Sequence, residues 1–234
     1  MKKLIDLLQI ITLAPFHLDK GARLHVIRGL IKNQGLKSFI DGFGNLWVKK
    51  GQGPKRILID AHMDTVFGLR RKKYFFSPDN GHIMGTLDNS VGCAIAMISL
   101  QNFASPSDIE LNIVFSVKEE VGGQGVRYII QNSEQNFDLC ITIDLTDAED
   151  GEMVYCENFS SRQYFSFCQS QIASSQIGVR QYALPDNGVI YGRRWNSVSV
   201  CPVSYGHMHS SSCMVPVSNI LLALDVIKKM IGRE

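Results

Sequence analysis

The pattern of apolar and polar residues predicts strands and helices that alternate along most of the chain. Short apolar runs typical of buried strands occur at residues 46–49, 57–61, 111–117, 139–145 and 197–203. Helical spacing or longer apolar runs predict helices at residues 4–12, 21–33, 89–103, 125–131, 160–176 and 217–231. Strands separated by helices indicate an α/β fold, a mostly parallel mixed sheet sandwiched by helices. We expect a single domain over residues 1–234.

The amino terminus resembles a signal peptide at first sight, because two lysines precede an apolar stretch. Asp6 and Gln9 interrupt that stretch, and its leucines repeat at the spacing of an amphipathic helix. The six cysteines form no CxxC pair, and the net charge of +2 does not favour a nucleic-acid or membrane partner. The basic run at residues 70–73 is expected to be a solvated loop. We therefore expect a cytoplasmic protein without a nucleic-acid or membrane partner.

Polar side chains follow the predicted strands where those strands end. His62 and Asp64 come directly after the strand at 57–61, and Asp88 lies in the turn before the helix at 89–103. The remaining members of this set are Glu119, Glu120, Asp144 and His209. Ligands of open α/β sheets bind beyond the carboxyl ends of the strands, so we expect these side chains to lie close together.

Each of these residues also has a structural explanation. Asp88 could cap a helix, the pair Glu119 and Glu120 could be solvated in a loop, and Asp144 could accept hydrogen bonds from turn amides. Crowding them at one half-buried edge is unfavourable, however, unless cations compensate their charges. Two histidines with three carboxylates suit zinc, cobalt or manganese better than calcium or magnesium. The set therefore predicts a site for two divalent metal ions.

Five short segments occur in the order seen in one known group of enzymes. They are AHMDTV, GTLDNSVG, FSVKEEVGGQG, IDLTDAED and HMHS. With these segments the chain resembles the co-catalytic dinuclear zinc aminopeptidases and their deacylase and carboxypeptidase relatives. It is most similar to the deblocking, or glutamyl, aminopeptidases that form tetrahedral particles. The resemblance covers most of the chain, including LPDNGVIYGRRWNSVSVCPV before the last histidine.

The resemblance implies a role for each residue of the set. Asp88 would bridge two metals, Glu119 would be the general base, and Asp64 would orient the imidazole of the first histidine. The implied metal ligands are His62, Asp88, Glu120, Asp144 and His209. Spacing alone does not separate His209 from His207, but the family's last histidine is typically followed by serine, which selects His209.

The resemblance implies a metal-dependent hydrolase of amide bonds with two ions, zinc or else cobalt or manganese. The first hypothesis is an aminopeptidase acting on peptides. The second is a deacylase of N-acyl amino acids or other small amides, and the third is a non-catalytic metal-binding homologue. The motifs do not separate the first two hypotheses, because both share the metal chemistry.

The chain departs from the similar family between its first two metal ligands. Family members carry an inserted dimerisation domain there, whereas the interval from His62 to Asp88 is too short for a folded domain. We therefore expect a catalytic core that forms a monomer or a simple dimer and has an open, shallow cleft. Residues 67–84, which include Tyr74, Phe75 and Phe76, are the candidate cover of that cleft, although these aromatic residues could instead pack onto the sheet edge.

Overall fold

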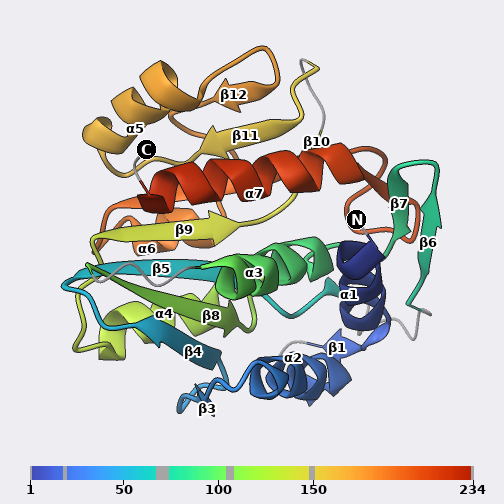
Figure 1. Ribbon diagram of the computed structural model, residues 1–234, viewed down its shortest axis with the longest axis horizontal. Helices are drawn as coiled ribbons and strands as arrows, with labels where there is room; N and C mark the ends of the chain where they lie inside the picture. The colour runs from blue at the N-terminus through green and yellow to red at the C-terminus, as the bar shows by residue number, and fades with distance from the viewer. Residues whose placement is uncertain (1, 18–19, 67–73, 104–107, 148–150, 233–234) are drawn as a thin grey trace.

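The computed structural model describes residues 2–17, 20–66, 74–103, 108–147 and 151–232 (Figure 1). The helices are α1 (Lys2–Leu13), α2 (Ala22–Asn33), α3 (Ser90–Asn102), α4 (Gln124–Asn132), α5 (Arg162–Phe167), α6 (Asn187–Tyr191) and α7 (Val217–Gly232). The strands are β1 (Phe16–His17), β2 (Lys20–Gly21), β3 (Ser38–Ile40), β4 (Leu46–Gly51), β5 (Lys55–His62), β6 (Phe76–Asp79), β7 (His82–Gly85), β8 (Ile109–Ser116), β9 (Leu139–Ile143), β10 (Thr146–Asp147), β11 (Val154–Glu157), β12 (Ile177–Val179), β13 (Ser197–Ser204) and β14 (Cys213–Pro216).

The central sheet is mixed, with a parallel middle. Its strand order is β12-β11-β13-β9-β5-β8-β4-β3, and β10 pairs with β13. The four middle strands β13, β9, β5 and β8 pair in parallel, whereas β3, β4 and β11 pair antiparallel with their neighbours on the path toward the middle. Parallel pairing brings the carboxyl ends of β5, β8 and β9 to one edge, with His62 opposite Ser116. This confirms the predicted mostly parallel sheet.

Helices cover both faces of this sheet. Helices α3 and α7 contact each other and the sheet on one face, where α1 also packs against α3 (Figure 1). On the other face, α4 and α6 enclose a smaller apolar cluster that includes Leu58, Val114 and Cys140. Helix α3 is buried on almost every side, from Ser90 to Met97, which explains why its sequence is apolar without a helical stripe. The layers are those of an α/β sandwich.

The region after residue 151 differs from its prediction. The expected helix at 160–176 is the short helix α5 followed by a π-helical turn, Cys168–Ile172. The strands β11 and β12, on either side of this turn, were not predicted. Both are short, and β11 is buried along its whole length, so its sequence carries no alternation of apolar and polar residues.

The segment expected to cover the cleft is also different. Its described part contains the hairpin β6–β7, which joins β14 in a separate three-stranded sheet. Tyr74 is held by backbone groups of Phe16, which donates to its hydroxyl at 3.0 Å and accepts from it at 3.2 Å. Phe76 packs against the main core. Residues 67–73, including the basic run, lie outside the described residues. No helix in the described part of the chain is long and apolar enough to cross a membrane.

Candidate metal centre

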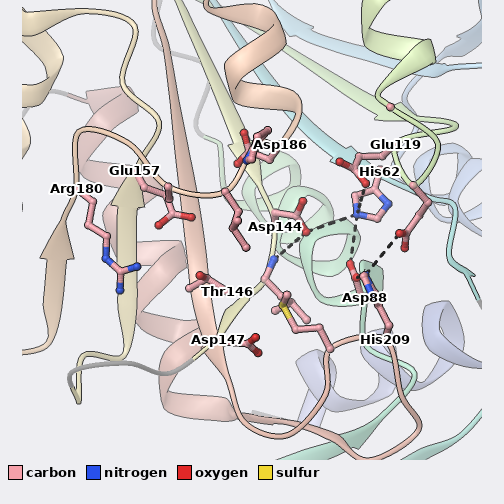
Figure 2. A pocket seen from close by; sticks show the side chains of 17 residues that line it. His62, Asp88, Glu119, Asp144, Thr146, Asp147, Glu157, Arg180, Asp186 and His209 are labelled. Atoms are coloured by element: carbon pink, nitrogen blue, oxygen red, sulfur yellow. Dashed lines mark hydrogen bonds and ion pairs between the residues drawn. The ribbon is translucent and has the colours of Figure 1, made fainter.

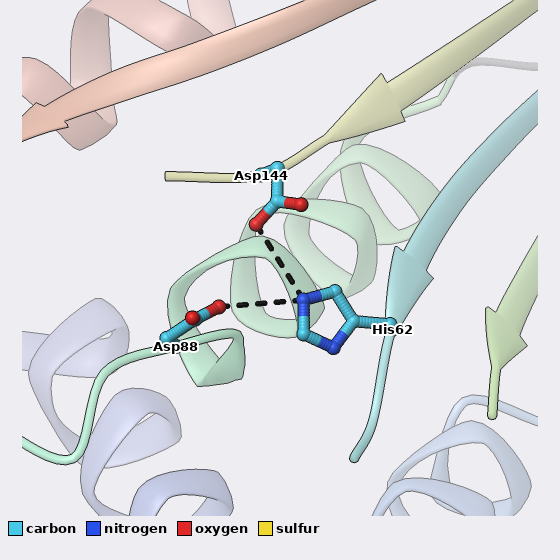
Figure 3. A group of neighbouring side chains, drawn as sticks. All are labelled: His62, Asp88 and Asp144. Atoms are coloured by element: carbon cyan, nitrogen blue, oxygen red, sulfur yellow. Dashed lines mark ion pairs between the residues drawn. The ribbon is translucent and has the colours of Figure 1, made fainter. Parts of the chain in front are cut away.

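His62 is the last residue of β5, and its buried imidazole points beyond the sheet edge (Figure 3). Its Nδ1 atom lies 3.0 Å from the backbone oxygen of Asp64, which fixes the ring orientation. Its Nε2 atom lies 3.3 Å from Oδ1 of Asp88 and 3.5 Å from Oδ1 of Asp144. The imidazole nitrogen that remains for a ligand therefore faces two carboxylates.

Asp88 precedes α3 but does not cap it. The N-cap is Asn89, whose Oδ1 accepts from the amide of Gly92 at 2.8 Å and whose Nδ2 donates to the carbonyl of Ile143 at 2.7 Å. Asn89 thus ties the start of α3 to the end of β9. The alternative that Asp88 serves as a helix cap is therefore wrong. Its carboxylate instead lies between His62 and His209, and its Oδ2 atom is 3.1 Å from Nε2 of His209.

Glu119 and Glu120 lie in a turn after β8. The turn begins with Lys118 at a positive φ of 57° and closes through amides that donate to the carbonyl of Glu119. The carboxylate of Asp64 accepts from the amide of Glu119 at 3.1 Å and from that of Glu120 at 3.2 Å. Oε2 of Glu119 lies 4.0 Å from Nε2 of His62, whereas Oε2 of Glu120 lies 3.5 Å from Nε2 of His209. The two side chains therefore face different histidines.

Asp144 and His209 complete the set. Asp144 follows β9, and its Oδ1 accepts from the amide of Leu145 at 2.8 Å, so the predicted contact with a turn amide coexists with its contact to His62. His207 is exposed, and its backbone oxygen accepts from the amide and the hydroxyl of Ser210. The chain turns at residues 208–209, and the structure brings Nε2 of His209 to Oδ2 of Asp88.

Among the described residues, two groups of ligand atoms meet at Asp88. His62, Asp88 and Asp144 form one group, and Asp88, Glu120 and His209 form the other, with the ligand atoms of each group lying within 4.8 Å of one another. Oε1 of Glu120 is buried and has no hydrogen-bond partner within the described residues, and the buried Oδ1 of Asp88 faces Nε2 of His62 at 3.3 Å. Buried carboxylate oxygens beside imidazoles fit cations held by these two ligand groups. The donor set suits zinc, cobalt or manganese.

The electrostatics of the set point the same way. Burial, reinforced by neighbouring carboxylates, raises the pKa of Glu119 to about 8 and that of Glu120 to about 7. Burial also raises the pKa of Asp144. Burial acts upward on the pKa of Asp88 as well, but hydrogen bonds with His209 and His62 hold it well below its usual range. Carboxylates crowded in this way are stabilised in their charged form by cations.

Two residues that the sequence analysis did not single out hold this arrangement together. Asn89 is the first, as the cap of α3. The second is Arg23, fully buried in α2, which donates to the carbonyl of Met63 at 2.7 Å and to those of Ile11 and Ala14. Arg23 lies on the buried face of α2 with Ile27 and Ile31. A charged residue at helical spacing from apolar ones is the sequence pattern that could have indicated a buried arginine here.

A cavity of about 520 Å³ extends from the two ligand groups (Figure 2). Besides the predicted residues, its lining includes Thr146, Glu157, Arg180 and residues 183–186. None of its lining residues comes from the described part of the expected cover, residues 74–84. The cover proposed for Tyr74, Phe75 and Phe76 is therefore wrong, because these side chains lie elsewhere. The sequence did not indicate residues 183–186 as part of the cavity lining.

Comparison with known proteins gives a family and a fold. The sequence model described as peptidase family M28 matches residues 45–193, more than half of the chain. A probable carboxypeptidase from Paracoccidioides brasiliensis is 34% identical over 113 residues, 44% of this chain and 25% of that protein. The match thus spans a quarter of the length of this curated relative.

Solved structures match over nearly the whole chain at low sequence identity. Aminopeptidase APDkam598 from the archaeon Desulfurococcus kamchatkensis has a TM-score of 0.78 and 15% identity, covering 100% of this chain and 95% of its own. A TET aminopeptidase from a marine sediment Thaumarchaeota archaeon has a TM-score of 0.79 and 13% identity, covering 99% of this chain and 97% of its own. At these identities the likeness establishes a zinc-exopeptidase-like fold.

Proposed function

The chain belongs to peptidase family M28, a family of metallopeptidases with co-catalytic metal ions, and on this premise we propose that it is a dinuclear aminopeptidase acting on peptides. The observation that carries the proposal is the pair of ligand groups that share Asp88. The aminopeptidases among the similar folds support the choice of substrate. The proposed metal ligands are His62, Asp88, Glu120, Asp144 and His209, with zinc as the proposed metal.

Glu119 is proposed as the general base. Glu119, unlike Glu120, belongs to neither ligand group. Its carboxylate nevertheless lines the same cavity and lies 4.0 Å from Nε2 of His62. Burial raises the pKa of Glu119 to about 8 in the metal-free protein, and cations bound nearby would lower it toward the range in which a carboxylate both accepts and releases a proton. Two bound cations would supply Lewis acidity toward the scissile carbonyl and the attacking water. Glu119 would accept the proton of that water and deliver it to the leaving nitrogen.

Asp64 acts as a positioning residue in this proposal. Its carboxylate accepts from the amides of Glu119 and Glu120, and its carbonyl contacts the ring of His62. One buried residue therefore connects the proposed base, one ligand from each group, and the end of β5. Such a connection keeps reacting groups at a fixed separation, which is worth orders of magnitude in rate.

Arg180 favours a second candidate, a hydrolase whose substrate carries a free α-carboxylate. Such substrates are N-acyl amino acids and peptides cleaved at their carboxyl end, and the curated relative is a probable carboxypeptidase. Arg180 lines the cavity, and a guanidinium is the side chain best suited to bind a carboxylate. This candidate predicts that substrates with an amidated carboxyl end are poorer.

One panel of substrates separates these candidates. Metal-reconstituted protein is assayed with aminoacyl amides, N-acyl amino acids and short peptides blocked at either end, with a chelator as control. An aminopeptidase cleaves only substrates with a free amino terminus, and the second candidate only those with a free carboxylate. If the activity persists in the presence of the chelator, the reaction does not depend on a metal. If no amide is cleaved, the hypothesis that remains is a non-catalytic metal-binding homologue.

We further propose that residues 1–234 act as one catalytic domain in the cytoplasm. The six cysteines are free and buried in the structure, which is compatible with a reducing compartment. The interval between His62 and Asp88 holds a small hairpin, so we propose that assembly does not proceed through a domain inserted there.

A further inference from the structure

A second group of acidic side chains lies in the same cavity, away from the two histidines. Carboxylate oxygens of Glu157 and Asp186 and the sulfur of Cys201 lie within 4.8 Å of one another. Figure 2 shows Glu157 on the opposite side of Asp144 from His62. Neither Glu157 nor Asp186 has a part in the proposed metal centre, so this end of the cavity needs its own explanation.

Glu157 is a buried carboxylate that faces the cavity without a full set of partners. It ends β11, where it lies opposite Ser199 of β13, and only 4% of the residue is exposed. Its Oε2 atom has no hydrogen-bond partner within the described residues. Burial, together with the nearby charge of Asp186, raises the pKa of Glu157 to about 7. A carboxylate held in this way is stabilised by a cation that enters the cavity.

The other two members of the group have roles in the fold. Asp186 is the N-cap of α6, and its Oδ1 accepts from the amide of Val189 at 3.2 Å. Cys201 is buried in β13, and burial raises the pKa of its thiol well above the usual value, so it stays a neutral thiol. Asp186 is engaged as a helix cap, and Oε2 of Glu157 is the buried carboxylate oxygen of this group that has no hydrogen-bond partner within the described residues. One such oxygen suits a singly charged organic cation better than a third metal ion.

The wall beside Glu157 is apolar and well supported. Leu145, Ala183, Leu184 and Pro185 also line the cavity, and the last three directly precede Asp186 in the chain. Asn158 fixes this wall, because its Oδ1 accepts from the amide of Ala183 and its Nδ2 donates to the carbonyl of Leu184, both at 2.9 Å. An apolar wall that leads to a carboxylate complements the methylene stem and charged end of a basic side chain.

Arg180 offsets this charge only in part, because its guanidinium acts downward on the pKa of Glu157 and that pKa nevertheless stays raised to about 7. Its guanidinium lies over the ring of Tyr155, 3.4 Å from the ring centroid, and the hydroxyl of Tyr155 donates to Glu152 at 2.7 Å. In Figure 2, Glu157 lies between Arg180 and Asp144. In this view the carboxylate of Glu157 lies nearer to Asp144 than the guanidinium of Arg180 does, and both side chains line the cavity.

We propose that this end of the cavity is a specificity subsite, in which Glu157 binds the ammonium or guanidinium group of a substrate side chain. The protein then acts preferentially on peptides that begin with lysine or arginine. This inference rests on the proposed aminopeptidase function, and it assigns Glu157 to the side chain of the first residue rather than to its α-amino group.

The test compares lysyl and arginyl with leucyl and norleucyl amides, using metal-loaded wild type and the variants Glu157→Gln and Asp147→Asn. Asp147 is the matched control, an exposed carboxylate that lines the same cavity. We expect Glu157→Gln to lower kcat/KM for the basic substrates by about 10- to 100-fold, the usual loss for one hydrogen bond to a charged group. The leucyl substrate should change less than about threefold, and Asp147→Asn should leave the preference in place.

A second measurement does not depend on turnover or on a variant. Free L-lysine and L-norleucine differ only at the end of the side chain, and isothermal titration of metal-loaded wild type should give tighter binding of lysine. If leucyl substrates are cleaved as well as lysyl ones, the subsite is wrong and the aminopeptidase proposal stands. If no amide is cleaved, the aminopeptidase proposal fails, and the titration alone decides the subsite.

Three further outcomes would overturn the inference. An equal loss for lysyl and leucyl substrates in Glu157→Gln would assign this residue to the α-amino group or to the fold. If Asp147→Asn weakened the preference for basic substrates as much as Glu157→Gln does, the preference would come from the overall negative charge of the cavity and not from a site at Glu157. Equal binding of lysine and norleucine to the wild type would exclude the subsite even if Glu157→Gln did not fold.

Discussion

Asp64 accepts a hydrogen bond from the backbone amide of Glu119, with Oδ1 and the amide nitrogen 3.1 Å apart. The two residues are far apart in the sequence, and this bond joins the end of β5 to the turn after β8. The family resemblance implies that Asp64 orients the imidazole of His62. In the structure its backbone oxygen has the closer contact with the ring, at 3.0 Å, while Oδ1 lies 3.6 Å away. The carboxylate chiefly holds the turn that carries both glutamates.

This relationship predicts that Asp64 matters for rate through geometry. Asp64→Ala leaves the partly buried amides of Glu119 and Glu120 without their acceptor, which costs about 1 kcal/mol of unfolding free energy for each unsatisfied group. We expect kcat to fall by about 100-fold or more, because the proposed base is no longer fixed. Asp64→Asn keeps one acceptor oxygen and should lose less. Equal kcat for wild type and Asp64→Ala, at equal metal content, would contradict this role.

The two glutamates should respond differently to substitution. Glu119→Gln should retain both metals and lose most of its turnover, because only the proton relay is removed. Glu120→Ala should lose metal, since Glu120 belongs to the ligand group of Asp88 and His209. Metal content by elemental analysis and kcat are measured on both variants. If Glu119→Gln lost metal while Glu120→Ala stayed active, the roles of base and metal ligand would be exchanged between the two glutamates.

Arg23 should be essential to stability although it lies outside the proposed metal centre. Its guanidinium donates to three backbone carbonyls and has no exposed surface. Arg23→Met fills similar space but removes the donor to the carbonyls of Ala14 and Met63, while the carbonyl of Ile11 keeps the amide of Ala14, and we expect a loss of about 3 kcal/mol in urea unfolding. Arg28 is on the same helix and exposed, so Arg28→Met serves as the control and should change stability by less than about 0.5 kcal/mol. Comparable effects of both changes would refute the role of the buried guanidinium.

The metal-free protein should become less stable as the pH rises. The folded-state pKa is about 8 for Glu119, about 7 for Glu120 and about 9 for His209. Burial raises the first two values, and a hydrogen bond with Asp88 raises the third. Each is above its unfolded value, so the folded state binds more protons, and this stabilisation is lost between about pH 4.5 and 9.

Bound metal should reverse that trend, because cations bind the deprotonated ligands. Thermal unfolding at pH 5, 7 and 9, with chelator and with zinc, measures both slopes. Glu120→Gln should flatten the metal-free slope, since it removes one of the titrating carboxylates. A metal-free protein that is more stable at pH 9 than at pH 5 would contradict the prediction.

The short interval between His62 and Asp88 predicts a monomer or a simple dimer. Within the described residues that interval forms the hairpin β6–β7, which packs beside β14 and offers no separate assembly domain. Light scattering on the metal-loaded protein measures the mass directly. A particle of dodecamer size would refute this prediction without affecting the proposed metal ligands.

The sequence alone determined which segments are strands and helices in the middle of the chain, and which polar residues follow them. Apolar runs such as 57–61 and 111–117 record burial on both faces, and that requirement is local to each strand. Because parallel strands end at one edge, the sequence also predicted that His62, Asp88 and Asp144 would meet, and the structure brings them together.

Only the tertiary structure decided which groups of these residues face one another. That Asn89 rather than Asp88 caps α3, that Arg23 supports Met63, and that Glu157 faces the cavity all depend on partners distant in the sequence. The strand β11 carries no local pattern, because it is short and buried along its length. Hydrogen bonds between distant segments leave no periodic trace in either partner, so they emerge only when packing brings the segments together.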